Sequence, residues 1–357
     1  LMPTSAEPAH FIGRANLGLK NTNVALDAFR RALTLDPRDL ESMYWLGYTL
    51  VADGRAEDLS ANRRASTVRE ARKFLEQVAA AQPKRAEVHY ALGLASLAAG
   101  EHAVARQQLE RALSLEAASA DWHYHYARTL VALEDFGPAI AAAREAVSRT
   151  PQHRPARLLL GRELLRARQW TEAEANYRTL LSADAADAEA TIGLGQTLFE
   201  QGRHANAVEC LHSVAEPTRD SLYYLGRALA MLDDFQQSRT VYEQAISTFG
   251  PDAALCYALG CAQAHLRKWK TALAAFEQSL TFEDSGKSHI QLGHVRLAQG
   301  ERAAALAEYR NALEVSPQLP EAHHALGLYY YGAGKLDEAE REFTQAAQLA
   351  GDCAPAY

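Results

Sequence analysis

The sequence predicts an all-α solenoid built from stacked pairs of antiparallel helices. Three observations support this prediction. A small residue recurs along the 357-residue chain at an almost constant spacing. An alanine follows that residue by twelve positions in nearly every case, and a larger residue follows the alanine by four. Amphipathic stretches of helix length also alternate with short breaks, as in Glu321–Leu349, which is interrupted at 332–334.

The recurring small residue, here called the anchor, lies in the first helix expected of each pair. Successive anchors are separated by 34, 46, 34, 34, 34, 31, 34, 33 and 34 residues, a series that chance does not produce. The anchors are Gly13, Gly47, Gly93, Ala127, Gly161, Gly195, Gly226, Gly260, Gly293 and Gly327.

The second helix of each pair carries the alanine and the larger residue, here called the plug. Small residues allow two helix backbones to approach closely, and we expect the plug to fill the wedge between one pair and the next. The alanine position is filled by Ala25, Ala71, Ala105, Ala139, Ala173, Ala207, Ser238, Ala272, Ala305 and Ala339. The plugs are Phe29, Leu75, Leu109, Tyr177, Leu211, Tyr242, Phe276, Tyr309 and Phe343, and the fourth pair departs from the pattern with Ala143.

This Leu-Gly … Ala-x3-Phe spacing in a period of 34 residues resembles the tetratricopeptide repeat (TPR), a helix–turn–helix unit. About ten repeats would then form one solenoid over residues 1–357, because one helix pair buries too little apolar surface to fold alone. The resemblance implies a right-handed superhelix whose first helices line a concave surface. The expected repeats are about 6–39, 40–85, 86–119, 120–153, 154–187, 188–218, 219–252, 253–285, 286–319 and 320–353.

Two of these repeats are irregular. The second repeat carries twelve extra polar residues within 55–70, which form either a loop or a helical extension. The sixth repeat lacks three residues near 216–218, so its second helix should be shorter. After the tenth repeat, residues 354–357 look like the start of a further helix. This favours a fragment of a longer protein, although a natural end stays open.

Composition narrows the possible function classes. A net charge of −7 gives no global electrostatic reason to expect nucleic acid as a partner. No apolar run is long enough for membrane insertion. The four cysteines form no metal-like pairs, which suits reduced thiols and a cytoplasmic location, with the periplasm not excluded.

The sequence contains no recognisable catalytic motif. The histidine pairs His123/His125 and His323/His324 lie one or two residues apart, whereas metal-binding pairs on a helix need separations of three or four. We therefore expect no enzyme activity, no metal and no cofactor.

The TPR resemblance suggests which residues face the concave surface. Tyrosine and arginine recur three residues before and one residue after the anchor, and acidic residues recur six before it. Tyrosine offers rigid contact area and arginine binds carboxylates in a bidentate manner, so peptides with acidic segments are the expected ligands. Alternatively, these side chains pair with acids of neighbouring repeats. The predicted groove residues are Tyr44, Tyr48, Tyr90, Tyr124, Arg128, Arg162, Arg166, Tyr223, Arg227 and Tyr257.

Three hypotheses about function follow. The leading one is a non-catalytic scaffold that binds protein or peptide partners in the concave groove. The second is the substrate-recruiting TPR region of a larger enzyme. The third is a self-assembling solenoid, and thus a homo-oligomer, because open end repeats expose apolar surface.

Overall fold

The computed structural model describes residues 5–52, 59–116 and 119–353, which form twenty α-helices and no strand. The predicted all-α TPR solenoid is confirmed. The first helices of the pairs are α1 (Glu7–Gly18), α3 (Leu40–Val51), α5 (Ala86–Ala98), α7 (Ala120–Ala132), α9 (Arg154–Arg166), α11 (Ala188–Glu200), α13 (Arg219–Met231), α15 (Ala253–His265), α17 (Gly286–Ala298) and α19 (Pro320–Gly332). The second helices are α2 (Thr22–Leu35), α4 (Ala61–Ala81), α6 (His102–Leu115), α8 (Phe136–Arg149), α10 (Trp170–Ala183), α12 (His204–His212), α14 (Phe235–Phe249), α16 (Trp269–Phe282), α18 (Arg302–Val315) and α20 (Leu336–Cys353).

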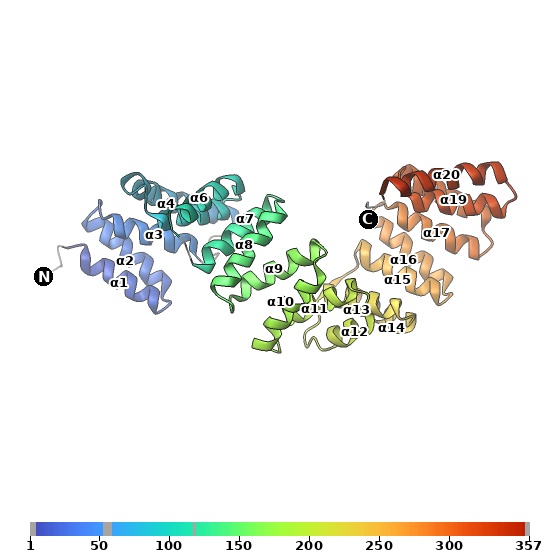
Figure 1. Cartoon of the computed structure of the whole chain (residues 1–357), viewed down its shortest axis with the longest axis horizontal. Coiled ribbons are helices and arrows are strands. Elements are labelled where there is room, and N and C mark those ends of the chain that lie inside the picture. Colours follow the sequence, from blue (N-terminus) through green and yellow to red (C-terminus); the bar gives the residue numbers. More distant parts are fainter. Residues whose placement is uncertain (1–4, 53–58, 117–118, 354–357) are drawn as a thin grey trace. The chain divides into compact units, whose positions relative to one another are not determined.

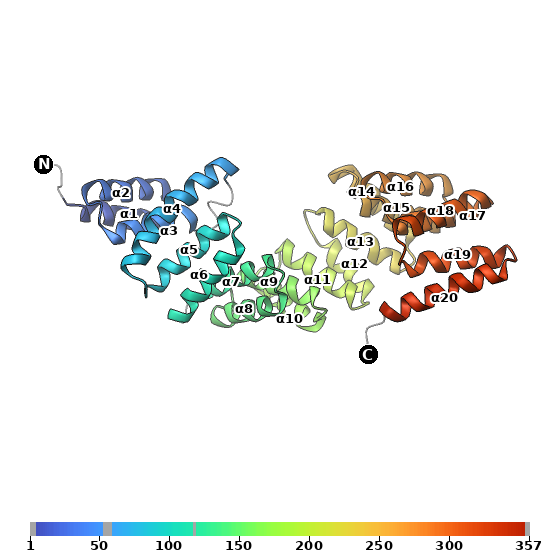
Figure 2. The same ribbon diagram turned by 90° about the horizontal axis from the view of Figure 1, so that it is seen from above.

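The chain divides into two compact units, residues 1–185 and 186–357. Each unit contains five helix pairs, α1–α10 in the first and α11–α20 in the second. Within a unit, each odd-numbered helix lies beside the even-numbered helix that follows it, as Figures 1 and 2 show for α1 with α2 and for α19 with α20. Each expected repeat interval thus holds one pair. Residues 354–357, where a further helix was expected, lie outside the described residues.

Each plug packs against the anchor of its own repeat. A Cβ atom added to Gly226 would lie 2.5 Å from the ring of Tyr242, and one added to Gly260 would lie 2.6 Å from the ring of Phe276. The same relation holds for the other glycine anchors that have a plug. The plug thus occupies the space that the missing Cβ leaves between the two helices of one pair. A contact with the following repeat, as predicted, occurs as well: the ring of the plug Tyr309 lies 6.2 Å from that of Tyr329 in the next repeat.

In the fourth repeat, the anchor has a side chain and the plug position holds a small residue. Its anchor is Ala127, which has a Cβ, and the residue at its plug position is Ala143. Both residues are fully buried. A methyl group on the anchor is thus accompanied by the loss of the large side chain that it would meet, so the departure from the pattern has a steric reason.

In each of the two irregular repeats, the second helix has an unusual length. Helix α4 has 21 residues, whereas α2 and α6 have 14 each, so the first seven residues of α4, 61–67, form a helical extension within the insertion. Residues 55–58 of the insertion lie outside the described residues. Helix α12 has only 9 residues, which confirms the predicted shortening of the sixth repeat.

The turn between the two helices of a pair requires a left-handed backbone conformation seven residues after the anchor. Gly100, Gly202, Gly300 and Gly334 hold this position with φ between 75° and 84°. Five other repeats place a residue with a side chain there, at φ between 56° and 61°, although an L-residue is strained in this region. These residues are Lys20, Glu134, Arg168, Asp233 and Arg267.

Replacing Glu134 by glycine is expected to raise the free energy of unfolding by about 1 kcal/mol, because glycine adopts this backbone conformation without steric cost. Glu134 is exposed, so little packing is lost. Urea denaturation followed by circular dichroism would measure the change. Glu134→Ala keeps the strain and serves as the control. A glycine variant that is no more stable than the alanine variant would argue against strain at this turn.

Candidate binding surface

The structure buries two of the predicted groove residues. Tyr44 is only 6% exposed, with the guanidinium of Arg85 lying 4.3 Å above its ring. Tyr90 is 5% exposed and stacks on Trp122 of the next helix pair at a centroid distance of 4.8 Å. The prediction that these two tyrosines contact a partner was therefore wrong. They pack at junctions between successive repeats.

Tyr48 and Tyr124 remain half-buried. The ring of Tyr48 stacks on that of Tyr44 at 6.0 Å. The ring of Tyr124 lies 5.4 Å from that of His153, and Arg128 lies 5.8 Å above it. Both tyrosines are thus partly covered by neighbouring side chains and partly exposed to solvent.

The predicted arginines of the first unit serve internal contacts. Arg162 and Arg166 are exposed but form ion pairs of 3.5 Å and 3.6 Å with the fully buried carboxylate of Glu163. Arg166 also lies 4.3 Å above the ring of Phe136. Glu163 sits two residues after the anchor and was not recognised from the sequence. Arg162 and Arg166 thus pair with an acid, as the alternative expected, but the acid belongs to their own repeat and not to a neighbouring one.

Two of the acidic residues that lie six before an anchor also form contacts within the chain. Glu41 accepts two hydrogen bonds from Arg85, with N–O distances of 2.6 Å and 3.1 Å. Asp121 lies 2.9 Å from the Nε2 atom of His153. In both cases the partner residue stands directly before the first helix of the following repeat. The acids at these positions therefore help to join successive repeats.

In the second unit, three predicted residues converge on one pocket of about 440 Å³. Tyr223 and Arg227 reach it from α13, and Tyr257 reaches it from α15. The remaining wall is largely apolar and comes from α11, α13, α14, α15 and the turn after α13. Its residues are Phe199, Ala230, Met231, Asp233, Phe235, Tyr242, Ala258, Cys261, Ala262 and His265.

Aromatic rings hold the guanidinium of Arg227 at this pocket. It lies 4.4 Å above the ring of Phe199 and 5.6 Å from the rings of both Tyr223 and Tyr224. Contacts of this kind fix the orientation of a guanidinium without using its N–H donors in ion pairs. Within residues 5–52, 59–116 and 119–353, no carboxylate forms an ion pair with Arg227, in contrast to Arg162 and Arg166.

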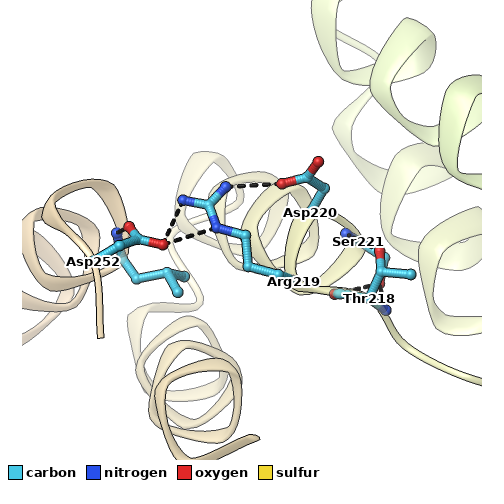
Figure 3. A network of polar contacts seen from close by, with 6 residues as sticks. Thr218, Arg219, Asp220, Ser221 and Asp252 are labelled. Carbon is cyan, nitrogen blue, oxygen red and sulfur yellow. Dashed lines mark hydrogen bonds and ion pairs between the residues drawn. The ribbon is translucent and has the colours of Figure 1, made fainter. Parts of the chain in front are cut away.

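A polar network at one end of α13 fixes the two helices that carry the pocket (Figure 3). Arg219 donates from Nε and Nη2 to the Oδ2 atom of Asp252, at 2.9 Å and 2.8 Å, and from Nη1 to Asp220 at 2.8 Å. Asp252 also accepts a hydrogen bond from the backbone N–H of Leu255 and so caps α15. Thr218 and Ser221 form a capping box that begins α13. Neither Arg219 nor Asp252 was recognised from the sequence, although Asp252 holds the N-cap position eight residues before the anchor that Asp39 and Asp187 hold in other repeats.

Two groups that could act as nucleophiles, the Ser42 hydroxyl and the Cys261 thiol, lie in surroundings that do not activate them. His10 and Asp39 both contact the hydroxyl of Ser42, which donates to Asp39, whereas an activated serine donates to the histidine. Burial raises the pKa of the Cys261 thiol to about 11, so this thiol stays protonated at neutral pH. No group of three potential metal ligands occurs in the described part of the chain.

None of the helices described here combines the length and the apolar character required to cross a membrane.

Comparison with known proteins gives consistent matches to one family. The family description "Tetratricopeptide repeat" matches residues 12–58, 61–121, 97–154 and 158–211, and related descriptions of the same repeat match 220–250, 293–334 and 320–353. Among solved structures, a tetratricopeptide repeat protein from Parabacteroides merdae covers 69% of this chain and 99% of its own, with a TM-score of 0.57 and 17% identity. A chain of the APC/C hetero-tetramer Cut9–Hcn1 matches over 97% of this chain and 73% of that chain, with a TM-score of 0.54 and 16% identity.

Curated relatives match over shorter stretches. The BBSome complex member BBS4 of Mus musculus is 29% identical over 111 residues, which are 31% of this chain and 21% of that protein. The photosystem I assembly protein Ycf3 of Synechococcus elongatus is 34% identical over 92 residues, which are 23% of this chain and 53% of that protein. The matched segments therefore span between a fifth and about half of these relatives. Repeat spacing, anchor packing and family matches agree, and the chain belongs to the tetratricopeptide repeat family.

Proposed function

We propose that this chain is a non-catalytic scaffold that binds protein partners, and that the pocket beside Arg227 receives a peptide segment carrying a carboxylate. The observation that carries this proposal is a half-buried arginine, oriented by three aromatic rings and without an ion-pair partner in the described residues, at the mouth of an apolar pocket. A guanidinium in this state is prepared for a bidentate hydrogen bond to a carboxylate.

The remaining pocket wall suggests what accompanies the carboxylate. Tyr223, Tyr257 and Phe235 supply aromatic surface, and Arg219 and Asp252 hold α13 and α15 in place before a ligand arrives. Little ordering of the site is then needed on binding, which favours affinity. An apolar side chain next to an acidic group is the ligand that suits both parts of the site.

The names of the relatives are consistent with this role. BBS4 is a member of a complex and Ycf3 is an assembly protein, and each matches this chain only over some of its repeats. The alternative of a substrate-recruiting region in a larger enzyme also involves partner binding in the groove. It differs only in needing catalytic motifs outside these 357 residues.

Replacing Arg227 by glutamate is expected to weaken partner binding by about 2–5 kcal/mol, because the variant places a carboxylate where the partner's carboxylate docks. Partners would be captured from source lysate on the immobilised chain and identified by mass spectrometry. The affinity of the identified partner for each variant would then be measured by calorimetry.

Arg302→Glu provides a control with the same change in charge. Arg302 is exposed at the first residue of α18, outside the pocket, where an acidic side chain suits the helix terminus. Equal affinities for the wild type and Arg227→Glu, with helicity unchanged, would remove the pocket from the proposed function. Loss of the partner in both variants would indicate a general electrostatic effect.

A further inference from the structure

Each helix pair within a unit packs against its neighbour through a fixed set of columns. The residue three before the anchor of one pair meets the residue five before the anchor of the next, as the 3.0 Å contact between His10 Nδ1 and Ser42 Oγ and the stacking of Tyr90 on Trp122 show. The residue one after the anchor meets the residue two before the next anchor, as when Arg14 lies 4.8 Å above the ring of Trp45. These contacts show which residues of two successive pairs lie opposite each other, and we call this set of contacts the repeat joint.

In every other repeat, one face of the first helix packs against the preceding repeat. Helix α1 has the same face, here called the incoming face, and this face has no partner among the described residues. Ile12, one residue before the anchor, is 52% exposed, whereas seven of the nine other residues in that column are buried. Phe11 occupies the column of Trp45 and is 55% exposed. Pro8, in the column of Ser42, is exposed as well. The exposed face of α1 is thus apolar and lies in the positions that elsewhere pack on a preceding repeat.

The last described pair, α19 and α20, has the opposite face of this joint, here called the receiving face, against which a following repeat would pack. A pocket of about 840 Å³ lies along α17, α19 and α20. Leu328, one residue after the anchor, is 50% exposed, and His324, three residues before it, is exposed beside it. Ala347 and Ala350 of α20 extend the wall with small side chains that leave room for a helix.

We propose that α1 of one copy of this chain packs into the α19–α20 pocket of a second copy, and so continues the internal joint between molecules. The register follows from the interior contacts: Phe11 of one copy lies against Leu328 of the other, and Pro8 lies beside His324. The two faces differ, so the contact is heterologous and adds copies in one direction.

Sedimentation equilibrium of the 357-residue chain over a range of concentrations tests the proposal. The wild type is expected to show an average mass that rises with concentration. Phe11→Glu removes the incoming face and Leu328→Glu removes the receiving face. Each variant alone should associate at least about tenfold more weakly than the wild type. Both residues are exposed, so circular dichroism should show unchanged helicity.

Mixing the two variants separates this geometry from other modes of association. Phe11→Glu keeps an intact receiving face and Leu328→Glu keeps an intact incoming face, so the mixture should form a heterodimer and nothing larger. Phe282→Glu serves as the matched control, because Phe282 is 52% exposed at the end of α16, outside both faces, and this variant should associate like the wild type. A wild-type mass that stays monomeric at every concentration, or variants that still self-associate, would overturn the proposal.

Discussion

Replacing Gly260 by alanine is expected to lower the free energy of unfolding by about 1–3 kcal/mol. Alanine is the better helix former by about 1 kcal/mol, so propensity alone predicts the opposite sign. The loss arises because the new methyl group would lie 2.6 Å from the ring of Phe276, which is fully buried and has no free space to move into. Urea denaturation monitored by circular dichroism would measure it.

The sign of this effect should reverse when the ring is removed. Phe276→Ala alone is expected to cost about 3–5 kcal/mol through the cavity that it leaves. In that background Gly260→Ala meets no ring, so helix propensity should make it stabilising by up to about 1 kcal/mol. The fourth repeat, with Ala127 beside Ala143, already holds this combination.

A glycine in open space provides the control for this cycle. Gly332 is the last residue of α19, and no atom lies within 4 Å of a Cβ added to it. Gly332→Ala should therefore leave stability unchanged or raise it slightly. If Gly260→Ala proved destabilising to the same extent with and without Phe276, steric contact with the plug could not be the cause.

Acid is expected to destabilise the first unit by about 3 kcal/mol through His125 alone. Burial, reinforced by the nearby charge of Arg128, lowers the pKa of His125 from 6.5 to about 4. Between these two values the unfolded chain binds a proton that the folded protein excludes. The stability that is fully present above pH 6.5 is therefore lost as the pH falls toward about 4.

His125→Phe isolates this contribution. The imidazole lies 5.0 Å from the ring of Tyr124 and 5.9 Å from that of Tyr90, contacts that a phenyl ring retains. Urea midpoints measured near pH 7.5 and near pH 5 should fall less in the variant than in the wild type. His123 and His294, whose pKa values burial also lowers, titrate in both proteins. Equal losses in the two proteins would contradict the role of His125.

The fold was predictable because its packing repeats in the sequence. An anchor such as Gly226 and a plug such as Tyr242 meet inside one helix pair, at a fixed separation along the chain. Each of these pairs therefore encodes its own contact, and nine copies of the pattern reinforce one prediction. The length of the extended α4 was not fixed in this way, because the insertion has no counterpart in the other repeats.

The candidate site was only partly predictable, because exposure at one column depends on residues that do not repeat. Tyr90 is buried by Trp122 and Tyr44 is covered by Arg85, whereas Tyr223 and Tyr257 line an open pocket from the same column. The arginines differ for a similar reason. Glu163 occurs in one repeat and pairs with Arg162, whereas Arg227 is positioned by Phe199 of the preceding repeat and by Tyr224 of its own helix.

The short α12 has a consequence for the order in which the molecule unfolds. A solenoid has no central core, so each pair depends on its own helices and on its nearest neighbours. With 9 residues, α12 forms fewer backbone hydrogen bonds than the 14-residue helices of other pairs. We therefore expect the α11–α12 pair to open at a lower free energy than those pairs. The repeats before it and those after it would exchange amide hydrogens as separate blocks, each opening without the other.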